Sequence, residues 1–207
     1  MKMKTFQIFV VLFFLALSTV ANASQVILNP SQDTFIWSYA PGSNYGGLDY
    51  IVFGCQNGWW LDSLIQFDLS SYSGVVVESA YLRLYVYSSE GPFPPTGIFI
   101  GRVAASWDEM TVTWNNKPGA ADCTYIAGPG SVDAWWVIDV ASYVNDWVSG
   151  TYDNYGFIIG TLDTEDNYFH VWSREYANPD YRPQLELNYH DVSVQPTSLG
   201  IIKAIYK

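Results

Sequence analysis

The stretch Ser79-Ala-Tyr-Leu-Arg-Leu-Tyr-Val-Tyr-Ser88 has the clearest periodicity of two in the chain. One set of alternating side chains is apolar (Ala80, Leu82, Leu84 and Val86), and the other consists of Tyr81, Arg83, Tyr85 and Tyr87. Because successive side chains of a β-strand point to opposite faces, this pattern predicts a strand with one core face. The second face is a tyrosine ladder with an arginine set in it. It lies either under loops or open to a ligand.

Further β-type segments surround this stretch and are separated by turns rich in glycine, proline and asparagine. They cover residues 26–28, 31–37, 50–54, 59–69, 98–103, 155–160, 167–173 and 184–189. Asn57-Gly58 is typical of the tip of a β-hairpin. Many short strands with few other elements predict an all-β fold, namely an antiparallel jelly-roll-like β-sandwich with one short helix.

The single helical candidate covers residues 139–150. Its apolar residues Val140, Tyr143, Val144 and Trp147 follow the i, i+3, i+4, i+7 spacing of a helix with one buried face. Asp139 suits the N-cap, and Gly150 suits the position after the last turn. We expect this helix to lie across one end of the sheets.

The stretch from Ser106 to Gly119 contains a second alternating segment, Thr111-Val-Thr-Trp114, which predicts another strand. Trp107 and Trp114 are either a platform for a ligand or supports of the core. Buried aromatic residues are much commoner than ligand-binding ones, which favours the second interpretation. We expect Glu109 to be a loop carboxylate held by backbone donors rather than a catalytic acid.

The first residues have the features of a signal peptide. Two lysines precede an almost wholly apolar segment, residues 6–20, and Ala21-Asn22-Ala23 fits a signal-peptidase site. We therefore predict a signal peptide over residues 1–23, a single domain over residues 24–190, and a linker and tail over residues 191–207. The tail is either a frayed end or a docking or sorting tag. The cleaved protein is expected to be secreted, extracellular and without a membrane span, and it is either free or associated with the cell surface.

The charge of the chain limits the classes of partner that it can bind. The formal net charge is −11, and it becomes −13 once Lys2 and Lys4 of the signal peptide are removed. This negative charge argues against nucleic acids and anionic membrane surfaces as partners. The aromatic share of 17% suits both β-structure and stacking against sugars.

Cys55 and Cys123 are the only cysteines. Cysteines occur in bridged pairs more often than free in exported proteins. A disulfide between them is therefore a candidate, and free thiols are the alternative that the sequence leaves open.

No arrangement of residues in the sequence points to catalysis. His170 and His190 are the only histidines, and their spacing matches no metal-binding motif, so both are predicted to be structural or surface residues. Asp163, Glu165 and Asp166 are weak candidates for binding calcium, with a solvated turn as the alternative. We predict no cofactor and no enzymatic activity.

Several motifs, taken in order, resemble one known family. They are Asp33-Thr34, Asn44-Tyr45-Gly46, Ser63 to Ser70, Ser79 to Tyr85, Trp107 to Pro118, Asp139-Val140 to Trp147, Asn154-Tyr155-Gly156, Phe169 to Glu175, and Arg182 to Leu185. This series is similar to the DNRLRE domain, also described as carbohydrate-binding module family 96.

The resemblance implies a non-catalytic β-sandwich of secreted and cell-surface proteins, whose characterised binders recognise alginate. This chain departs from the family pattern at Gln66, where a basic residue is common. Because its overall charge is negative, we expect a neutral glycan or a surface protein rather than alginate as its partner. A structural or assembly subunit of an extracellular layer, without glycan binding, is the alternative.

The candidate carbohydrate-binding residues are aromatic residues near turns, together with two arginines. They are Trp37, Tyr39, Trp59, Trp60, Arg83, Trp135, Trp136 and Arg174. Adjacent residues of a strand point to opposite faces. We therefore expect one tryptophan of each adjacent pair to lie outside the core.

Overall fold

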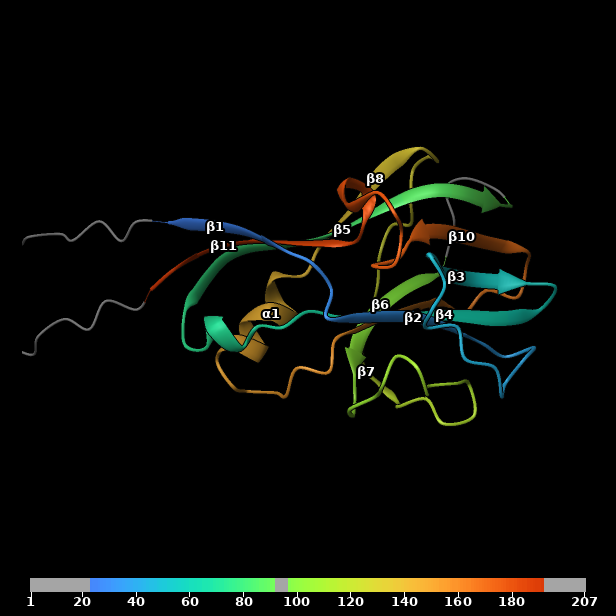
Figure 1. The fold of residues 1–207 in the computed structure, drawn as a ribbon, viewed down its shortest axis with the longest axis horizontal. Coiled ribbons are helices and arrows are strands. Elements are labelled where there is room, and N and C mark those ends of the chain that lie inside the picture. Colours follow the sequence, from blue (N-terminus) through green and yellow to red (C-terminus); the bar gives the residue numbers. More distant parts are fainter. Residues whose placement is uncertain (1–22, 92–96, 192–207) are drawn as a thin grey trace, which may run out of the picture.

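The computed structural model describes residues 23–91 and 97–191, and it confirms the all-β antiparallel sandwich with one short helix (Figure 1). The strands are β1 (Ser24–Leu28), β2 (Gln32–Trp37), β3 (Tyr50–Gln56), β4 (Trp59–Gln66), β5 (Val76–Glu90), β6 (Ile98–Val103), β7 (Ala120–Tyr125), β8 (Ala134–Asp139), β9 (Phe157–Thr161), β10 (Asn167–Trp172) and β11 (Gln184–His190). The helical elements are α1 (Ala141–Val148) and the 3-10 turns η1 (Ser70–Tyr72) and η2 (Pro179–Tyr181).

The strands join into one curled sheet with the order β1-β11-β5-β10-β3-β4-β9-β6-β7. β2 adds to β4 and β8 adds to β5. Every strand pair is antiparallel. The two halves of the sheet pack against each other, because Leu84 of β5 and Phe169 of β10 share one buried cluster with Ile159 of β9.

β5 has the two faces that its sequence predicts. The apolar set is buried in the main core, and Tyr81, Arg83, Tyr85 and Tyr87 are half-buried on the opposite face. The strand pairs first with β11 and then with β10 along its length. It therefore spans the whole sandwich (Figure 1).

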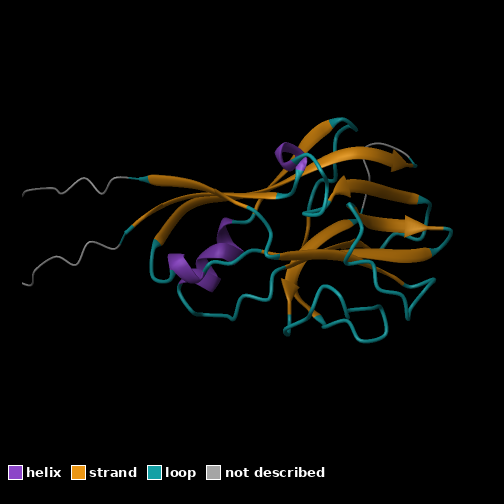
Figure 2. Cartoon of the chain, viewed as in Figure 1, coloured by secondary structure: helices purple, strands orange, loops and turns teal. Residues whose placement is uncertain are grey.

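The prediction of a strand over residues 111–114 is wrong. Residues 104–119 form a loop, seen in teal in Figure 2, which covers a second, smaller apolar cluster of buried residues, Ile36, Leu64, Val103, Val112 and Ile158. Trp107 and Trp114 pack on this cluster. Val112 is the buried residue of this loop. The alternation of polar and apolar residues over 111–114 therefore results from a loop that packs on the core, not from a strand that pairs in a sheet. The prediction that the two tryptophans support the core is confirmed.

The helix α1 packs against β5 and lies at the same end of the molecule as β1 and β11 (Figure 1). Its buried residues include Tyr143, Val144 and Trp147, as the spacing predicts. The predicted end of the helix is confirmed, since Gly150 follows the C-cap Ser149 with a positive φ, but the predicted N-cap is wrong, because Val140 occupies it and Asp139 ends β8. The Asp139 carboxylate still accepts a hydrogen bond from the backbone N–H of Ala141 at 3.0 Å.

The remaining elements differ from the predicted ones mainly at their ends, as in β5, which covers Val76–Glu90 rather than residues 79–88. β4 ends at Gln66, earlier than predicted, and no strand was expected over Ala120–Tyr125 or Ala134–Asp139. β7 lies at the edge of the sheet and most of its side chains are exposed, so its sequence shows no apolar alternation.

The predicted disulfide is wrong, because Cys55 and Cys123 are both free. Cys55 is buried on β3, whereas Cys123 is exposed on β7. Three strands lie between β3 and β7 in the sheet order, so the two cysteines are not on neighbouring strands.

The predicted signal peptide, apart from Ala23, and most of the predicted C-terminal tail lie outside the described residues. Among residues 23–91 and 97–191, no helix is both long and apolar enough to cross a membrane.

Candidate functional site

One face of β5, β10 and β3 is built from aromatic side chains. Along β10, Tyr168, His170 and Trp172 alternate with buried residues and point to this face. The register places His170 opposite Val52 and Trp172 opposite Tyr50 on β3. The alternation of each strand thus brings aromatic side chains from distant parts of the sequence together.

The rings on this face contact one another directly. Trp172 stacks between Tyr87 and Tyr176, with ring centroids 3.7 Å apart on both sides and planes within 9° and 5°. His170 lies 5.5 Å from the ring of Tyr50 and 5.7 Å from that of Tyr87. We call this surface the aromatic face and define it by Trp37, Tyr39, Tyr50, Trp59, Tyr85, Tyr87, Trp135, Tyr168, His170 and Trp172.

A cavity of about 320 Å³ opens in the aromatic face. It is lined by Phe35, Trp37, Tyr45, Tyr50, Val52, Gln56, Leu61, Tyr168 and His170. The walls are mainly apolar, and the Gln56 amide donates a hydrogen bond to the Tyr168 hydroxyl at 3.0 Å. Apolar walls with a few polar groups are the usual lining of a site for a small ligand or a sugar ring.

Three exposed or half-exposed rings continue the face beyond this cavity. The ring centroids of Trp37 and Tyr39 are 5.1 Å apart. Those of Tyr39 and Trp59 are 5.7 Å apart, and these two rings meet edge to face. Tyr39 is 61% exposed and Trp59 is 45% exposed. These three predicted residues therefore form one solvent-accessible aromatic group beside the β3–β4 hairpin.

Trp60 lies on the other side of β4. It is 38% exposed and lines a separate cavity of about 310 Å³ together with Trp114 and Lys117. The expectation that only one residue of the Trp59–Trp60 pair lies outside the core is wrong. Both are exposed, because they stand at the hairpin end of the strand, where the core no longer covers either face.

The second pair of tryptophans behaves as predicted. Trp136 is 7% exposed and stacks on Phe53 in the main core, with ring centroids 5.2 Å apart. Trp135 is half-buried at the other end of the aromatic face, beside Tyr85 and under the guanidinium of Arg83 at 4.9 Å. Trp136 thus belongs to the core and not to a binding surface.

Two titratable groups of the aromatic face, Tyr87 and His170, have pKa values shifted toward their neutral forms. Burial, together with the nearby Tyr50 and Asp49, raises the pKa of Tyr87 to about 12. Burial lowers the pKa of His170, and Glu90 opposes this shift. Both side chains are therefore uncharged at neutral pH, which suits an uncharged ligand.

Arg174, the remaining predicted residue, lies in a different place. Its guanidinium pairs with Glu109 at 2.8 Å and with Glu175 at 3.6 Å. Asp33 accepts a hydrogen bond from the Arg174 backbone N–H at 2.9 Å. Arg174 is thus engaged in an acidic cluster formed by Asp33, Glu109 and Glu175, which we call the carboxylate cluster.

The structure does not gather the predicted calcium ligands Asp163, Glu165 and Asp166 into a group. Within the described residues, the three acidic residues that bring one ligand oxygen each within 4.8 Å of the others are those of the carboxylate cluster. Asp166 instead accepts a hydrogen bond from the backbone N–H of Asn57 in the hairpin turn.

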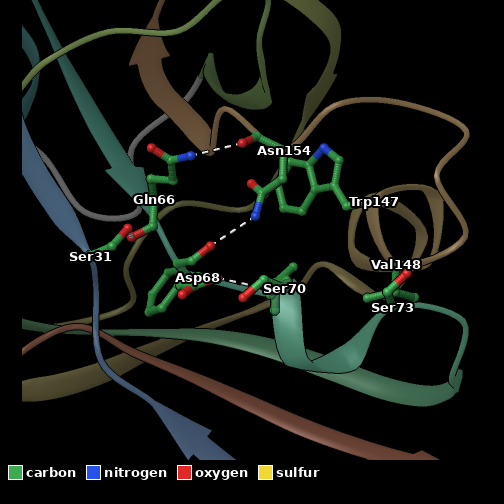
Figure 3. A pocket seen from close by; sticks show the side chains of 10 residues that line it. Ser31, Gln66, Asp68, Ser70, Ser73, Trp147, Val148 and Asn154 are labelled. Atoms are coloured by element: carbon green, nitrogen blue, oxygen red, sulfur yellow. Dashed lines mark hydrogen bonds between the residues drawn. The ribbon is translucent and has the colours of Figure 1, made fainter.

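Another cavity, of about 520 Å³, lies between the end of β4 and the segment after α1 (Figure 3). Its amide side chains hydrogen-bond with the chain itself. Gln66 donates to the carbonyl of Asn154 at 2.7 Å, and Asn154 donates to the carbonyl of Phe67 at 2.8 Å. Gln66 therefore ties the end of β4 to the segment after α1.

Tyr50, Tyr168 and Trp172 belong to the aromatic face, although they were not predicted as binding residues. The alternation of Tyr168, His170 and Trp172 with apolar residues was the available signal, because it marks a strand with one aromatic face. The carboxylate cluster was missed because its residues come from three distant segments.

Comparison with known proteins gives both a family and relatives. The profile of carbohydrate-binding module family 96 matches residues 24–189. The chain is 28% identical over 181 residues to a tRNA nuclease WapA of Bacillus subtilis strain 168 and 25% identical over 193 residues to a gellan lyase of a Bacillus species. These alignments cover 78% and 89% of this chain, but only 7% and 8% of those proteins.

Proposed function

Because the chain belongs to carbohydrate-binding module family 96, we propose that it is a non-catalytic carbohydrate-binding module that acts outside the cell and holds a polysaccharide on its aromatic face. The observation that carries this proposal is the group formed by half-buried Trp37 and exposed Tyr39 and Trp59 beside an aromatic-lined cavity. Tyrosine and tryptophan rings present a flat apolar surface to sugar rings and a polar atom to their hydroxyl groups.

We propose a neutral rather than an acidic polysaccharide as the ligand. The chain has a formal net charge of −11, which repels a polyanion at long range. The two arginines among the candidate binding residues are engaged in ion pairs, since Arg83 pairs with Glu186 at 3.5 Å and Arg174 pairs with Glu109.

A non-catalytic role is supported by the small part of each related enzyme's length to which this chain aligns. The chain spans 7% of the related nuclease and 8% of the related gellan lyase. A domain of this size attached to different enzymes is better explained by targeting than by a shared chemical step.

The binding proposal is tested by affinity electrophoresis through gels that contain neutral polysaccharides, such as β-glucans, xylans and mannans, with alginate and gellan as acidic probes. We expect retardation on at least one neutral polymer. Trp59→Ala and Tyr39→Ala should each weaken it by about tenfold, since loss of a stacked ring costs about 1–2 kcal/mol.

Trp60→Ala is the matched control, because Trp60 is the neighbouring exposed tryptophan on the other side of β4. It should bind like the unchanged protein. Absence of retardation on every polymer would overturn the binding proposal and favour a structural subunit of an extracellular layer. Equal losses for Trp59→Ala and Trp60→Ala would reject the aromatic face as the site.

A further inference from the structure

We propose that Asp33, Glu109 and Glu175 form a binding site for a divalent cation, with Ca²⁺ as the preferred ion. The three residues come from β2, from the loop over residues 104–119, and from the segment that follows β10. One carboxylate oxygen of each lies within 4.8 Å of the others. A cation held there would join these three segments.

Asp33 supplies the strongest indication of a ligand. Its side chain is 1% exposed, and its Oδ1 atom has no hydrogen-bond partner. The Oε2 atom of Glu175 is also buried without a partner. A buried carboxylate oxygen without a partner has lost its hydration without compensation, so native proteins usually pair such atoms. A cation would pair both atoms at once.

The other oxygens of the cluster are already used. Asp33 Oδ2 accepts from the backbone N–H of Arg174 at 2.9 Å. Glu109 Oε1 accepts from the backbone N–H of Asp33 at 2.7 Å, and its Oε2 pairs with the Arg174 guanidinium. These contacts hold the three carboxylates in place, and they leave Asp33 Oδ1 and Glu175 Oε2 as the free ligand atoms.

The charge of the cluster also matches a divalent ion. Three carboxylates face one guanidinium, that of Arg174, which leaves a formal charge of −2 when all of them are ionised. Hard divalent cations prefer oxygen ligands, and Ca²⁺ accepts the irregular geometry that carboxylates from separate loops provide. Backbone carbonyls and water would complete its coordination.

Protonation of the carboxylates is the alternative to cation binding as a way to reduce the negative charge of the cluster. Burial, reinforced by the charge of Glu175, raises the pKa of Asp33 well above its usual range in the absence of a cation. A protonated cluster would be stable without metal, whereas a metal site would gain stability from Ca²⁺. The two cases are therefore distinguished by adding the ion.

The experiment uses the chelator-treated protein at neutral pH. Thermal unfolding is followed while Ca²⁺ is added, and Tb³⁺ luminescence sensitised by the aromatic residues reports direct binding. We expect Ca²⁺ at a hundredfold excess over its Kd to raise the Tm by about 5–10 °C. Mg²⁺ serves as the smaller, less adaptable competitor.

The test variant is Glu175→Gln, because Glu175 lies at the rim of the cluster and its loss leaves the contacts of Asp33 intact. Its Ca²⁺ affinity should fall by at least about tenfold. Asp33→Asn is the second variant and should abolish the Ca²⁺-induced rise in Tm. Glu165→Gln makes the same chemical change at an exposed acid outside the cluster and should leave the affinity unchanged.

Absence of a Tm rise and of Tb³⁺ luminescence in the unchanged protein would overturn the cation site. An equal loss of affinity in Glu165→Gln and Glu175→Gln would also overturn it. Neither result bears on glycan binding, which is measured on a different surface and with different variants.

Discussion

The Glu109 carboxylate accepts a hydrogen bond from the backbone N–H of Asp33 at 2.7 Å, although the two residues are 76 positions apart. The backbone N–H of Glu109 in turn donates to the Gln32 side chain at 3.2 Å. The Glu109 side chain therefore holds the loop over residues 104–119 against strand β2. The expectation that Glu109 is held by backbone donors is confirmed.

Replacing Glu109 should destabilise the fold. Glu109→Ala removes a charge-assisted hydrogen bond to Asp33 and the ion pair with Arg174, and should lower the free energy of unfolding by about 2–3 kcal/mol. Glu109→Gln keeps an acceptor for Asp33 and should lose less. Urea denaturation in the presence of a chelator measures both effects without a contribution from bound metal. A Glu109→Ala variant as stable as the unchanged protein would contradict the role of this side chain.

Gly46 allows the same loop to approach closely. A Cβ atom at this position would lie 2.1 Å from the Glu109 carbonyl oxygen, which is backbone and cannot move aside. Gly46→Ala should therefore lower the free energy of unfolding by about 3 kcal/mol or more. Gly42→Ala is the control, because the nearest atom to its Cβ would be 4.0 Å away. Equal stability of the two variants in urea denaturation would show that the loop is not fixed at Gly46.

The sequence predicts the strands that have one buried and one half-buried face. β5 is the clearest example, since Leu82 and Leu84 alternate with Arg83 and Tyr85 on the two faces that the structure shows. The same rule fails for residues 111–114, because a loop that buries Val112 produces a similar alternation without any strand partner. Periodicity reports burial, and it cannot distinguish a strand from a packed loop.

The two sites differ in how far the sequence could reveal them. Tyr39 and Trp59 lie near turns, where exposed rings are expected, and the structure brings them together. The carboxylate cluster depends on segments that are 76 and 66 residues apart along the chain, and only the fold joins them. Asp33 is the only charged residue of the predicted strand over residues 31–37, and this was the one local sign of the cluster.

Buried Trp136 and exposed Trp59 should contribute differently to the free energy of unfolding. Trp136→Ala removes a ring that is 7% exposed and stacks on Phe53, so it should lower the free energy of unfolding by about 3–5 kcal/mol. Trp59→Ala removes an exposed ring and should cost less than about 1 kcal/mol. Chemical denaturation of both variants checks this. A large loss for Trp59→Ala would mean that this ring supports the fold rather than a ligand.

The two thiols should differ in reactivity. Burial raises the pKa of Cys55 and also that of Cys123, but only Cys123 is exposed. A thiol reagent at mildly alkaline pH should therefore label Cys123 in the folded protein and Cys55 only after denaturation. Peptide mapping by mass spectrometry identifies the labelled residue. A peptide that joins both cysteines under non-reducing conditions would contradict the free thiols.

His170 should make the fold less stable as the pH falls. Burial lowers the pKa of His170 in the folded protein, so the unfolded chain, with an ordinary pKa of 6.5, binds its proton more readily. The stabilising contribution is complete above about pH 7 and is lost as the pH falls below the unfolded pKa and toward the folded one.

His170→Gln isolates this effect from the carboxylates that titrate in the same range. Urea denaturation at pH 7.5 and 5.5 should show a larger loss of stability in the unchanged protein than in the variant, because glutamine has no proton to bind. The half-buried position of His170 between Tyr50 and Tyr87 explains the direction, since neither ring supplies a negative charge to stabilise an imidazolium. Identical losses in the two proteins would show that His170 keeps an ordinary pKa in the aromatic face.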